Sequence, residues 1–271
     1  MLLFPNSKIN LGLNVVEKRP DGFHNIETIF YPVGLSDALE IIIANDGNFE
    51  FNHTGLSIEG NAEDNLCIKA YRLLAEDFKL APVKIHLLKV IPIGAGLGGG
   101  SSDGASTIKL LNKLFSLGLS IAGMAQYARK LGSDCAFFIE NTPAFAFGKG
   151  DHFEPLRVDL STFTILIVVP PIQVNTSEAY SRVMPSKTGK SLKDIVLQSI
   201  HRWRDHLEND FERSVFSDHP RILQIKKQLY DQGAVFASMS GSGSAVYGIF
   251  EKKKISLGSF SDCFVWLQQF R

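Results

Sequence analysis

The chain has 271 residues, and 45% of them are hydrophobic, which is enough to bury a large core in one domain or two. Its 28 basic and 28 acidic residues cancel, which excludes a global field favouring nucleic acid or an anionic membrane. Any anionic ligand must therefore be bound by local groups.

The number of cysteines and the length of the apolar runs indicate in which cellular compartment the protein is expected. Cys67, Cys135 and Cys263 show no spacing typical of zinc sites, and an odd, sparse count favours a reducing compartment. The first residues lack the pattern of a secretory signal, and the apolar run 163–169 is too short to span a bilayer. We predict a cytoplasmic protein, monomeric or homodimeric, that binds neither nucleic acid nor a membrane.

The first third of the chain is typical of β-strands. Turn residues separate four segments rich in β-branched and aromatic side chains, at 9–16, 26–33, 39–44 and 49–53. The turn at 45–48 predicts that the last two strands form a hairpin.

Helical and strand patterns then alternate. Asn65 begins a helical pattern that ends before Pro82, and 83–91 has the alternation of a strand. The remaining predicted elements are helices near 102–116 and 120–131, a strand at 163–169, a polar loop at 185–190, helices near 191–208 and 219–232, and two strands joined by a loop over 234–250. A polar turn at 148–151, followed by the new apolar strand at 163–169, predicts two domains, 1–150 and 151–271.

The segment 92–104 is the strongest functional signal. Six of the residues from 94 to 104 are glycine, and the segment joins a predicted strand to a predicted helix that begins with Ser-Ser-Asp. Glycine allows backbone N–H groups to approach a ligand closely, and a helix N-terminus attracts anions. The segment therefore predicts a phosphate site, whereas a flexible linker would not lie between an apolar strand and an amphipathic helix.

Three other glycine motifs fit this segment poorly. A Walker A loop would require a lysine after the glycines. Gly94, Gly96 and Gly99 match the dinucleotide pattern, but residues 106–123 contain no acidic residue that would bind a ribose. The catalytic loop of protein kinases is also missing.

Three segments together resemble the GHMP kinases, the superfamily that includes galactokinase, homoserine kinase and mevalonate kinase. The segments 7–11, 92–105 and 239–244 are similar to its first, second and third motifs, in the same order. The resemblance implies an α+β protein with two domains: an N-terminal domain like the second domain of ribosomal protein S5, and a ferredoxin-like C-terminal domain. It also implies an ATP-dependent kinase acting on a small molecule.

The resemblance implies a catalytic pair. Asp134 would accept the proton of the attacking hydroxyl, and Lys8 would keep Asp134 ionised and neutralise the transferring phosphoryl group. By its position alone, Asp134 could equally be a helix cap, and Lys8 a solvated strand end. Cys135 and Ala136 stand where relatives usually have Val-Pro, which is a departure from the family pattern.

The resemblance also implies how ATP is bound, with Mg²⁺ as its counter-ion. The implied ATP-binding residues are Asn65, Lys89, Pro92, Gly94, Gly96, Leu97, Gly98, Gly99, Gly100, Ser101 and Ser102. Asn65 could instead cap the helix that begins there, and Lys89 could be a surface residue. No carboxylate cluster dedicated to Mg²⁺ is evident, so we expect phosphates, water and a serine hydroxyl to hold the ion.

Further segments, 19–24, 63–66 and 132–134, narrow the resemblance to a kinase whose acceptor is cytidine diphosphate linked to methylerythritol. Phe23 and His24 suit stacking and hydrogen bonding to a cytosine, although relatives often have Tyr at position 23. Tyr180 could stack on the other face of the base or pack on its own helix. The implied substrate-binding residues are Asn10, Asp21, Phe23, His24, Thr176, Tyr180, Ser240, Gly241, Ser242 and Gly243.

Three rival functions remain. A different GHMP kinase would lack the Phe23–His24 base platform, and a non-catalytic sensor on the same fold would lack Lys8 or Asp134. A dinucleotide oxidoreductase, the weakest rival, would bind NAD.

Overall fold

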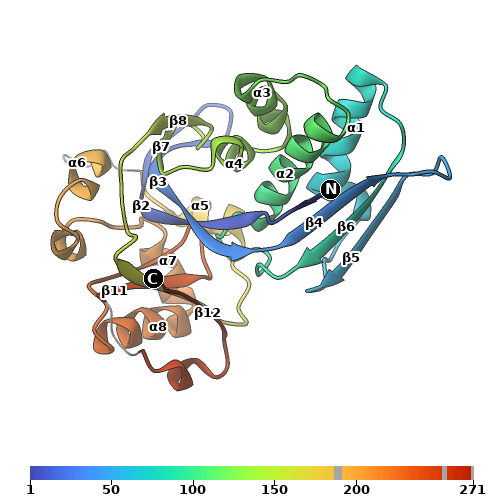
Figure 1. Ribbon diagram of the computed structural model, residues 1–271. Helices are drawn as coiled ribbons and strands as arrows, with labels where there is room; N and C mark the ends of the chain where they lie inside the picture. Colours follow the sequence, from blue (N-terminus) through green and yellow to red (C-terminus); the bar gives the residue numbers. More distant parts are fainter. Residues whose placement is uncertain (186–190, 252–254, 270–271) are drawn as a thin grey trace. The chain divides into compact units, whose positions relative to one another are not determined.

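The computed structural model describes residues 1–185, 191–251 and 255–269 (Figure 1). The predicted polar loop at 185–190 lies, apart from its first residue, outside this part of the chain. By their internal contacts the residues form two compact units. Unit 1 comprises 1–7, 34–93 and 98–142, and unit 2 comprises 8–33, 94–97 and 143–271.

These units are discontinuous in sequence because two long strands contribute to both. They are β2 (Asn6–Lys18) and β3 (His24–Ser36). The segment 94–97 belongs by its contacts to unit 2, although the residues on either side of it belong to unit 1. The predicted domains, 1–150 and 151–271, stay a prediction. The compact units differ from them because each unit combines segments from separate parts of the sequence.

A mixed sheet forms the framework of unit 1. Its strand order is β1-β4-β6-β5, with β1 at Leu2–Leu3, β4 at Ala38–Ile43, β5 at Glu50–Gly55 and β6 at Val83–Lys89. Along β6, Val83, Ile85 and Leu87 are buried while His86 and Leu88 are exposed, as the alternation of a strand requires. α2 packs against β1 and β4, which places helices on one face of this sheet (Figure 1).

The predicted hairpin at 39–53 is wrong. β4 and β5 are not neighbours, because β6 lies between them, antiparallel to β4 and parallel to β5. The turn residues at 45–48 do reverse the chain, but β6 carries the alternating apolar residues that fill the centre of the sheet. A local turn signal cannot reveal a strand that inserts from forty residues further along the chain.

The helices of unit 1 match the sequence patterns. Asn65 caps α1 (Leu66–Phe78) by accepting a hydrogen bond from the Cys67 N–H at 2.9 Å. α2 spans Gly99–Leu114, so it begins three residues before the predicted start, and α3 spans Ile121–Leu131. Three short elements complete the unit: η1 (Ala62–Asp64), η2 (Ser133–Ala136) and α4 (Phe137–Glu140).

Unit 2 contains two sheets. One has the order β2-β3-β7-β8, with β7 at Ala144–Phe147 and β8 at His152–Pro155. The other is antiparallel with the order β10-β11-β9-β12, and its strands are β9 (Phe163–Val169), β10 (Phe236–Met239), β11 (Val246–Glu251) and β12 (Phe264–Gln268). The predicted strand pair over 234–250 corresponds to β10 and β11.

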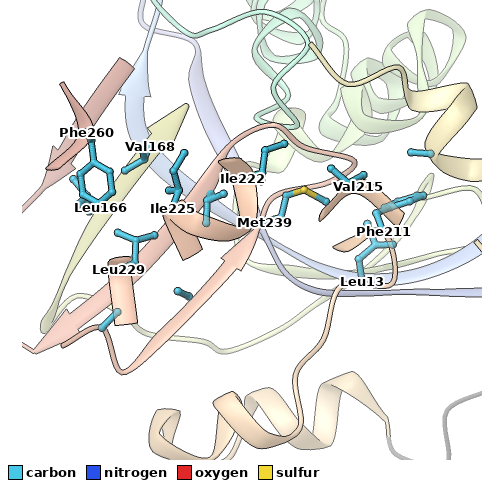
Figure 2. Close-up of a cluster of buried hydrophobic side chains, with 14 of the residues drawn as sticks. Leu13, Leu166, Val168, Phe211, Val215, Ile222, Ile225, Leu229, Met239 and Phe260 are labelled. Carbon is cyan, nitrogen blue, oxygen red and sulfur yellow. The ribbon is translucent and has the colours of Figure 1, made fainter. Parts of the chain in front are cut away.

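One buried cluster joins α8 (Pro220–Asp231) to the second sheet (Figure 2). Ile222, Ile225 and Leu229 recur on one face of α8 and are fully buried against residues of that sheet. Leu13 from β2 belongs to the same cluster, so this strand is anchored in the core of unit 2.

The predicted helix at 191–208 is interrupted. The structure has α6 (Leu192–Val196) followed by the 3-10 helix η3 (Ile200–Asp205), because Ile200 and Trp203 both turn into the core. The sequence patterns missed several short elements of this unit: β7, β8, β12, α5 (Thr176–Arg182), α7 (Glu212–Asp218) and η4 (Leu257–Phe260). Among the described residues, none of the helices is both long and apolar enough to cross a membrane.

Candidate active site

The glycine segment 92–104 leads into the N-terminus of α2, which begins at Gly99. Gly98 is the N-cap residue, with φ at 71° and no side chain to bond the first N–H groups of the helix. A Cβ added at Gly100 would meet nothing within 4 Å, so the backbone there is open to a ligand. Gly99, by contrast, faces the protein, and its Cβ would lie 2.9 Å from Lys89 Nζ.

Lys89 lies in a buried cluster beneath this helix start. It is 3% exposed, and its Nζ pairs with the carboxylates of Asp37 and of Asp103, the latter at 2.8 Å. Asp37 also accepts the backbone N–H groups of Val90 and Ile91, where β6 leads into the glycine segment. The structure therefore gives the Lys89 ammonium a structural role, and a contact of Lys89 with ATP stays a prediction.

Asp103 has an unusual environment within this cluster. It is 3% exposed, and its Oδ1 has no hydrogen-bond partner among the described residues. Burial raises the pKa of Asp103 to about 7, since the nearby Asp37 carboxylate adds to the effect and the Lys89 ammonium offsets only part of it. Two carboxylates thus share one ammonium, and the cluster is neutral only while one carboxyl group is protonated.

Asp134 lies in the same compact unit as the start of α2. It sits half-buried in η2, directly after Gly132, and Ser133 Oγ lies 3.3 Å from its carboxylate. The adjacent Cys135 is buried, and its thiol hydrogen-bonds with Ser101 in the first turn of α2. Burial also raises the pKa of the Cys135 thiol to about 12. The structure therefore brings the predicted proton acceptor near the serines of the glycine motif.

In unit 2, Lys8 lies in a buried polar network. Its Nζ donates to Asn10 Oδ1 at 2.6 Å and lies 4.6 Å from the centre of the Phe30 ring. The Lys8 side chain is 3% exposed, so this ammonium is held in one place within the protein. The interpretation of Lys8 as a solvated strand end is therefore wrong.

Asn10 connects Lys8 to the third motif. Its Nδ2 donates to Thr28 Oγ1 at 2.9 Å, and its Oδ1 lies 3.3 Å from the hydroxyl of Ser240. Tyr247 donates its hydroxyl to the Asn10 carbonyl at 2.7 Å. The first and third motifs, 230 residues apart in sequence, thus meet through hydrogen bonds that are all buried.

Gly96 completes this network. Ser240 Oγ donates to the Gly96 carbonyl at 2.9 Å, and a Cβ at Gly96 would lie 2.0 Å from the Ser240 carbonyl oxygen. Gly96 also has φ at +78°, which disfavours any other residue. The third-motif loop, residues 240–244, therefore packs directly on the backbone of Gly96, and the Ser240 hydroxyl adds a hydrogen bond there.

The aromatic residues form a group in unit 2. His24 stacks on Tyr180 with 5.0 Å between ring centroids, and Tyr180 meets Phe211 edge-on at 4.8 Å. Phe23 is 60% exposed, and Lys149 Nζ lies 5.2 Å from its ring centroid. The Tyr180 ring is therefore covered on one side by His24, while Phe23 offers an open aromatic surface.

Other predicted substrate residues have roles that the structure defines in part. Asp21 pairs with Arg19 and accepts the Phe23 N–H at 3.2 Å, so it shapes the turn that carries Phe23. The Arg19 guanidinium lowers the pKa of this carboxyl group. Burial and the nearby Lys18 lower the pKa of His24. Thr176 Oγ1 and Ser242 Oγ lie 2.9 Å apart, so the start of α5 meets the third-motif loop.

Several residues in these networks were not predicted from the sequence. Asp103 lies inside the glycine motif, and its position next to Ser102 could have marked it. Thr28, Asn209, Phe211, Glu212 and Tyr247 carry no motif signal, since their partners are distant in the chain.

Comparison with known proteins supports the resemblance to the GHMP kinases. Models of the GHMP kinase N-terminal domain and C-terminal domain match residues 65–149 and 191–256. A solved mevalonate kinase shares the fold, with a TM-score of 0.75 at 15% identity over 98% of both chains. The fold and both domain matches define a GHMP kinase, a small-molecule phosphotransferase.

Full-length relatives narrow this class. The 4-diphosphocytidyl-2-C-methyl-D-erythritol kinase of Bacteroides thetaiotaomicron is 54% identical over 93% of this chain and 92% of its own length. That of Cytophaga hutchinsonii is 55% identical over 93% of both chains. A crystal structure of 4-(cytidine 5'-diphospho)-2C-methyl-D-erythritol kinase matches with a TM-score of 0.81 and 27% identity over 98% of both chains. The chain belongs to the 4-diphosphocytidyl-2-C-methyl-D-erythritol kinase family.

The buried cluster predicts a pH-dependent effect of Asp103→Asn. Because the folded-state pKa of Asp103 is raised from 3.8 to about 7, the folded state retains a proton that the unfolded state has lost, and wild-type stability falls as pH rises through this window. Asparagine carries no charge, so the unfolding free energy of the variant relative to wild type should rise by roughly 1–3 kcal/mol between pH 5 and 8. Denaturant unfolding at both pH values measures this difference.

The matched control is Asp231→Asn, which removes an exposed carboxylate at the end of α8. Its effect should be the same at both pH values. An equally flat pH dependence for Asp103→Asn would contradict the burial of a shared proton in this cluster.

Proposed function

We propose that this enzyme transfers the γ-phosphoryl group of ATP to the 2-hydroxyl of 4-diphosphocytidyl-2-C-methyl-D-erythritol, a step in non-mevalonate isoprenoid precursor biosynthesis. The observation that carries the proposal is identity of 54–55% to kinases of that name over 93% of the chain. The chain retains Lys8 and Asp134, which a non-catalytic sensor would have lost. We place the reaction in the cytoplasm.

The proposed chemistry uses Lys8 and Asp134. Asp134 accepts the proton of the 2-hydroxyl as its oxygen attacks the γ-phosphorus, and the bond from that phosphorus to the β-phosphate oxygen breaks to release ADP. Lys8 supplies positive charge to the transferring group. Its burial supports this role, because an ammonium held by Asn10 needs little reorganisation as charge develops.

ATP would be held mainly by backbone groups. The residues that fit the phosphates are Gly94, Gly96, Leu97, Gly98, Gly99, Gly100, Ser101 and Ser102, with Pro92 shaping the turn. Asn65 and Lys89 would contribute to the adenine site. The described residues include no group of three or more His, Cys, Asp or Glu side chains able to hold a metal. Mg²⁺ fits this site if phosphates, water and the Ser101 or Ser102 hydroxyl bind it, and it would neutralise phosphate charge.

The acceptor would be recognised by the aromatic group and the third-motif loop. Phe23 provides an exposed ring for the cytosine, and His24 provides hydrogen-bonding nitrogens beside Tyr180. Asn10, Asp21, Thr176, Ser240, Gly241, Ser242 and Gly243 are the remaining residues that we assign to the acceptor. The contact between Thr176 and Ser242 supports this grouping, since it is exposed and joins the start of α5 to the loop.

Acceptor choice tests the function directly. ADP release from ATP and Mg²⁺ is measured with 4-diphosphocytidyl-2-C-methyl-D-erythritol, homoserine, mevalonate and galactose as acceptors. We expect turnover only with the cytidyl acceptor. Turnover with another acceptor would retain the kinase and discard the base platform, and ATP binding without any turnover would favour the sensor.

The catalytic role of Asp134 predicts a loss of turnover. Asp134→Asn keeps the shape of the side chain but removes the proton acceptor, and kcat should fall roughly 10²–10⁴-fold. Steady-state kinetics with the cytidyl acceptor measure this change, with Asp231→Asn as the control that should keep wild-type kcat. Near wild-type turnover in a folded Asp134→Asn variant would contradict the role.

The base platform predicts a change in acceptor affinity. Phe23→Ala removes an exposed ring, and the loss of a stacking interaction of about 1–2 kcal/mol should raise KM for the cytidyl acceptor about tenfold. KM for ATP should not change. An exposed control, Leu197→Ala, should leave both values at wild type, since Leu197 is 58% exposed and belongs to no motif. An unchanged acceptor KM in Phe23→Ala would place the base elsewhere.

A further inference from the structure

The segment 209–212, with the sequence Asn-Asp-Phe-Glu, follows η3, ends at the first residue of α7 and belongs to none of the three motifs. Its four side chains nevertheless contact three parts of unit 2 to which we assign site residues: strand β2, the Tyr180 ring, and the third-motif loop with the strand end before it. Asp210 accepts the Val15 N–H of β2 at 2.6 Å, and Phe211 packs on Tyr180. Asn209 and Glu212 act on the third-motif loop.

Asn209 holds the backbone on both sides of Ser240. Its Nδ2 donates to the Met239 carbonyl at 2.8 Å and to the Gly241 carbonyl at 2.9 Å, and its Oδ1 accepts the Phe211 N–H at 3.0 Å. The side chain is 3% exposed. Only an amide can donate two hydrogens to the loop and accept one from its own segment, so an aspartate of the same shape cannot replace it.

Glu212 fixes the strand end from which the loop starts. It accepts the Met239 N–H at 2.9 Å and the Ser238 hydroxyl at 3.0 Å, while Lys226 pairs with its other oxygen. Both peptide groups of Met239 are therefore bonded to this segment. Residues 209 and 212 thus fix the backbone on both sides of Ser240.

Ser240 transmits this position to the catalytic lysine. Its hydroxyl contacts Gly96 and Asn10, and Asn10 Oδ1 receives the ammonium of Lys8 at 2.6 Å. The path from Asn209 to Lys8 consists of hydrogen bonds within unit 2, so a displacement of the loop would reach the ammonium.

We propose that Asn209 is a positioning residue for phosphoryl transfer, which fixes the Ser240 loop and, through Ser240 and Asn10, the ammonium of Lys8. The inference rests on the proposed function, because it assigns Lys8 to the transferring group. A displaced ammonium would weaken charge stabilisation in the transition state, whereas the base platform of Phe23 and His24 would stay in place. The expected effect therefore falls on kcat.

The test compares Asn209→Asp with a matched control, Asn112→Asp, in the full-length enzyme. Asn112 Nδ2 also contacts two acceptors, the Leu119 carbonyl at 3.0 Å and the Met124 sulfur at 3.5 Å, and its Oδ1 accepts the Leu119 N–H. Asn112 lies near the C-terminal end of α2, away from the loop in sequence. Its variant therefore shows how much kcat changes when a hydrogen-bonded amide outside the proposed path is replaced.

We expect kcat of Asn209→Asp, measured on the folded protein at saturating ATP, to fall roughly 10- to 100-fold, and that of Asn112→Asp to stay within about twofold. If Asn209→Asp does not fold, Asn209→Ala removes the same donors without burying a carboxylate and is compared with Asn112→Ala. Lower thermal stability with unchanged kcat in the Asn209 variants would overturn the proposal.

A double-mutant cycle with Ser240→Ala provides a readout that a purely structural role would not change. If Asn209 acts through Ser240, the two substitutions together should lower kcat by less than the product of their separate effects. Independent, multiplying effects would overturn the proposal. Turnover of the wild-type enzyme separates failure of the proposed function from failure of the role of Asn209. If wild type does not phosphorylate the cytidyl acceptor, the proposed function is rejected. The double-mutant cycle is then run with whichever acceptor is phosphorylated.

Discussion

The approach of the Gly96 backbone to the Ser240 carbonyl constrains much of unit 2. No side chain fits at position 96, where a Cβ would lie 2.0 Å from that oxygen. Strand β2, the glycine segment and the third-motif loop can therefore share one buried network, in which Ser240 contacts both Gly96 and Asn10. An ammonium buried in such a network keeps its position without solvent, which is the condition for electrostatic preorganisation.

Charge is handled differently in unit 1. There the buried ammonium of Lys89 is paired with two carboxylates beneath the start of α2, so it is not available as a free charge. The cluster ties the end of β6 to the helix, because Asp37 also bonds the backbone at 90 and 91. The start of α2 is therefore held in place from below, and the phosphate site that we propose there would rely on backbone N–H groups and on the helix N-terminus.

The shared fold does not by itself select the acceptor. A mevalonate kinase has the same fold at 15% identity, so acceptor specificity must come from side chains placed on that fold. The group that we propose for this role is aromatic: Phe23 is exposed, and Tyr180 stacks on His24 and packs on Phe211. Rings with limited rotational freedom can bind a flat base with little loss of conformational entropy.

The sequence by itself determined the elements with strong local signals: the helix after Asn65, the glycine segment that leads into α2, and the strand pair around the third motif. These follow from periodicity, capping and glycine content, which act over a few residues. Only the tertiary structure decided the strand order, in which β6 separates β4 from β5, and the partners of Lys89, Asn10 and Asn209. Those contacts join residues that are 14 to 230 positions apart, and no local pattern encodes such a pairing.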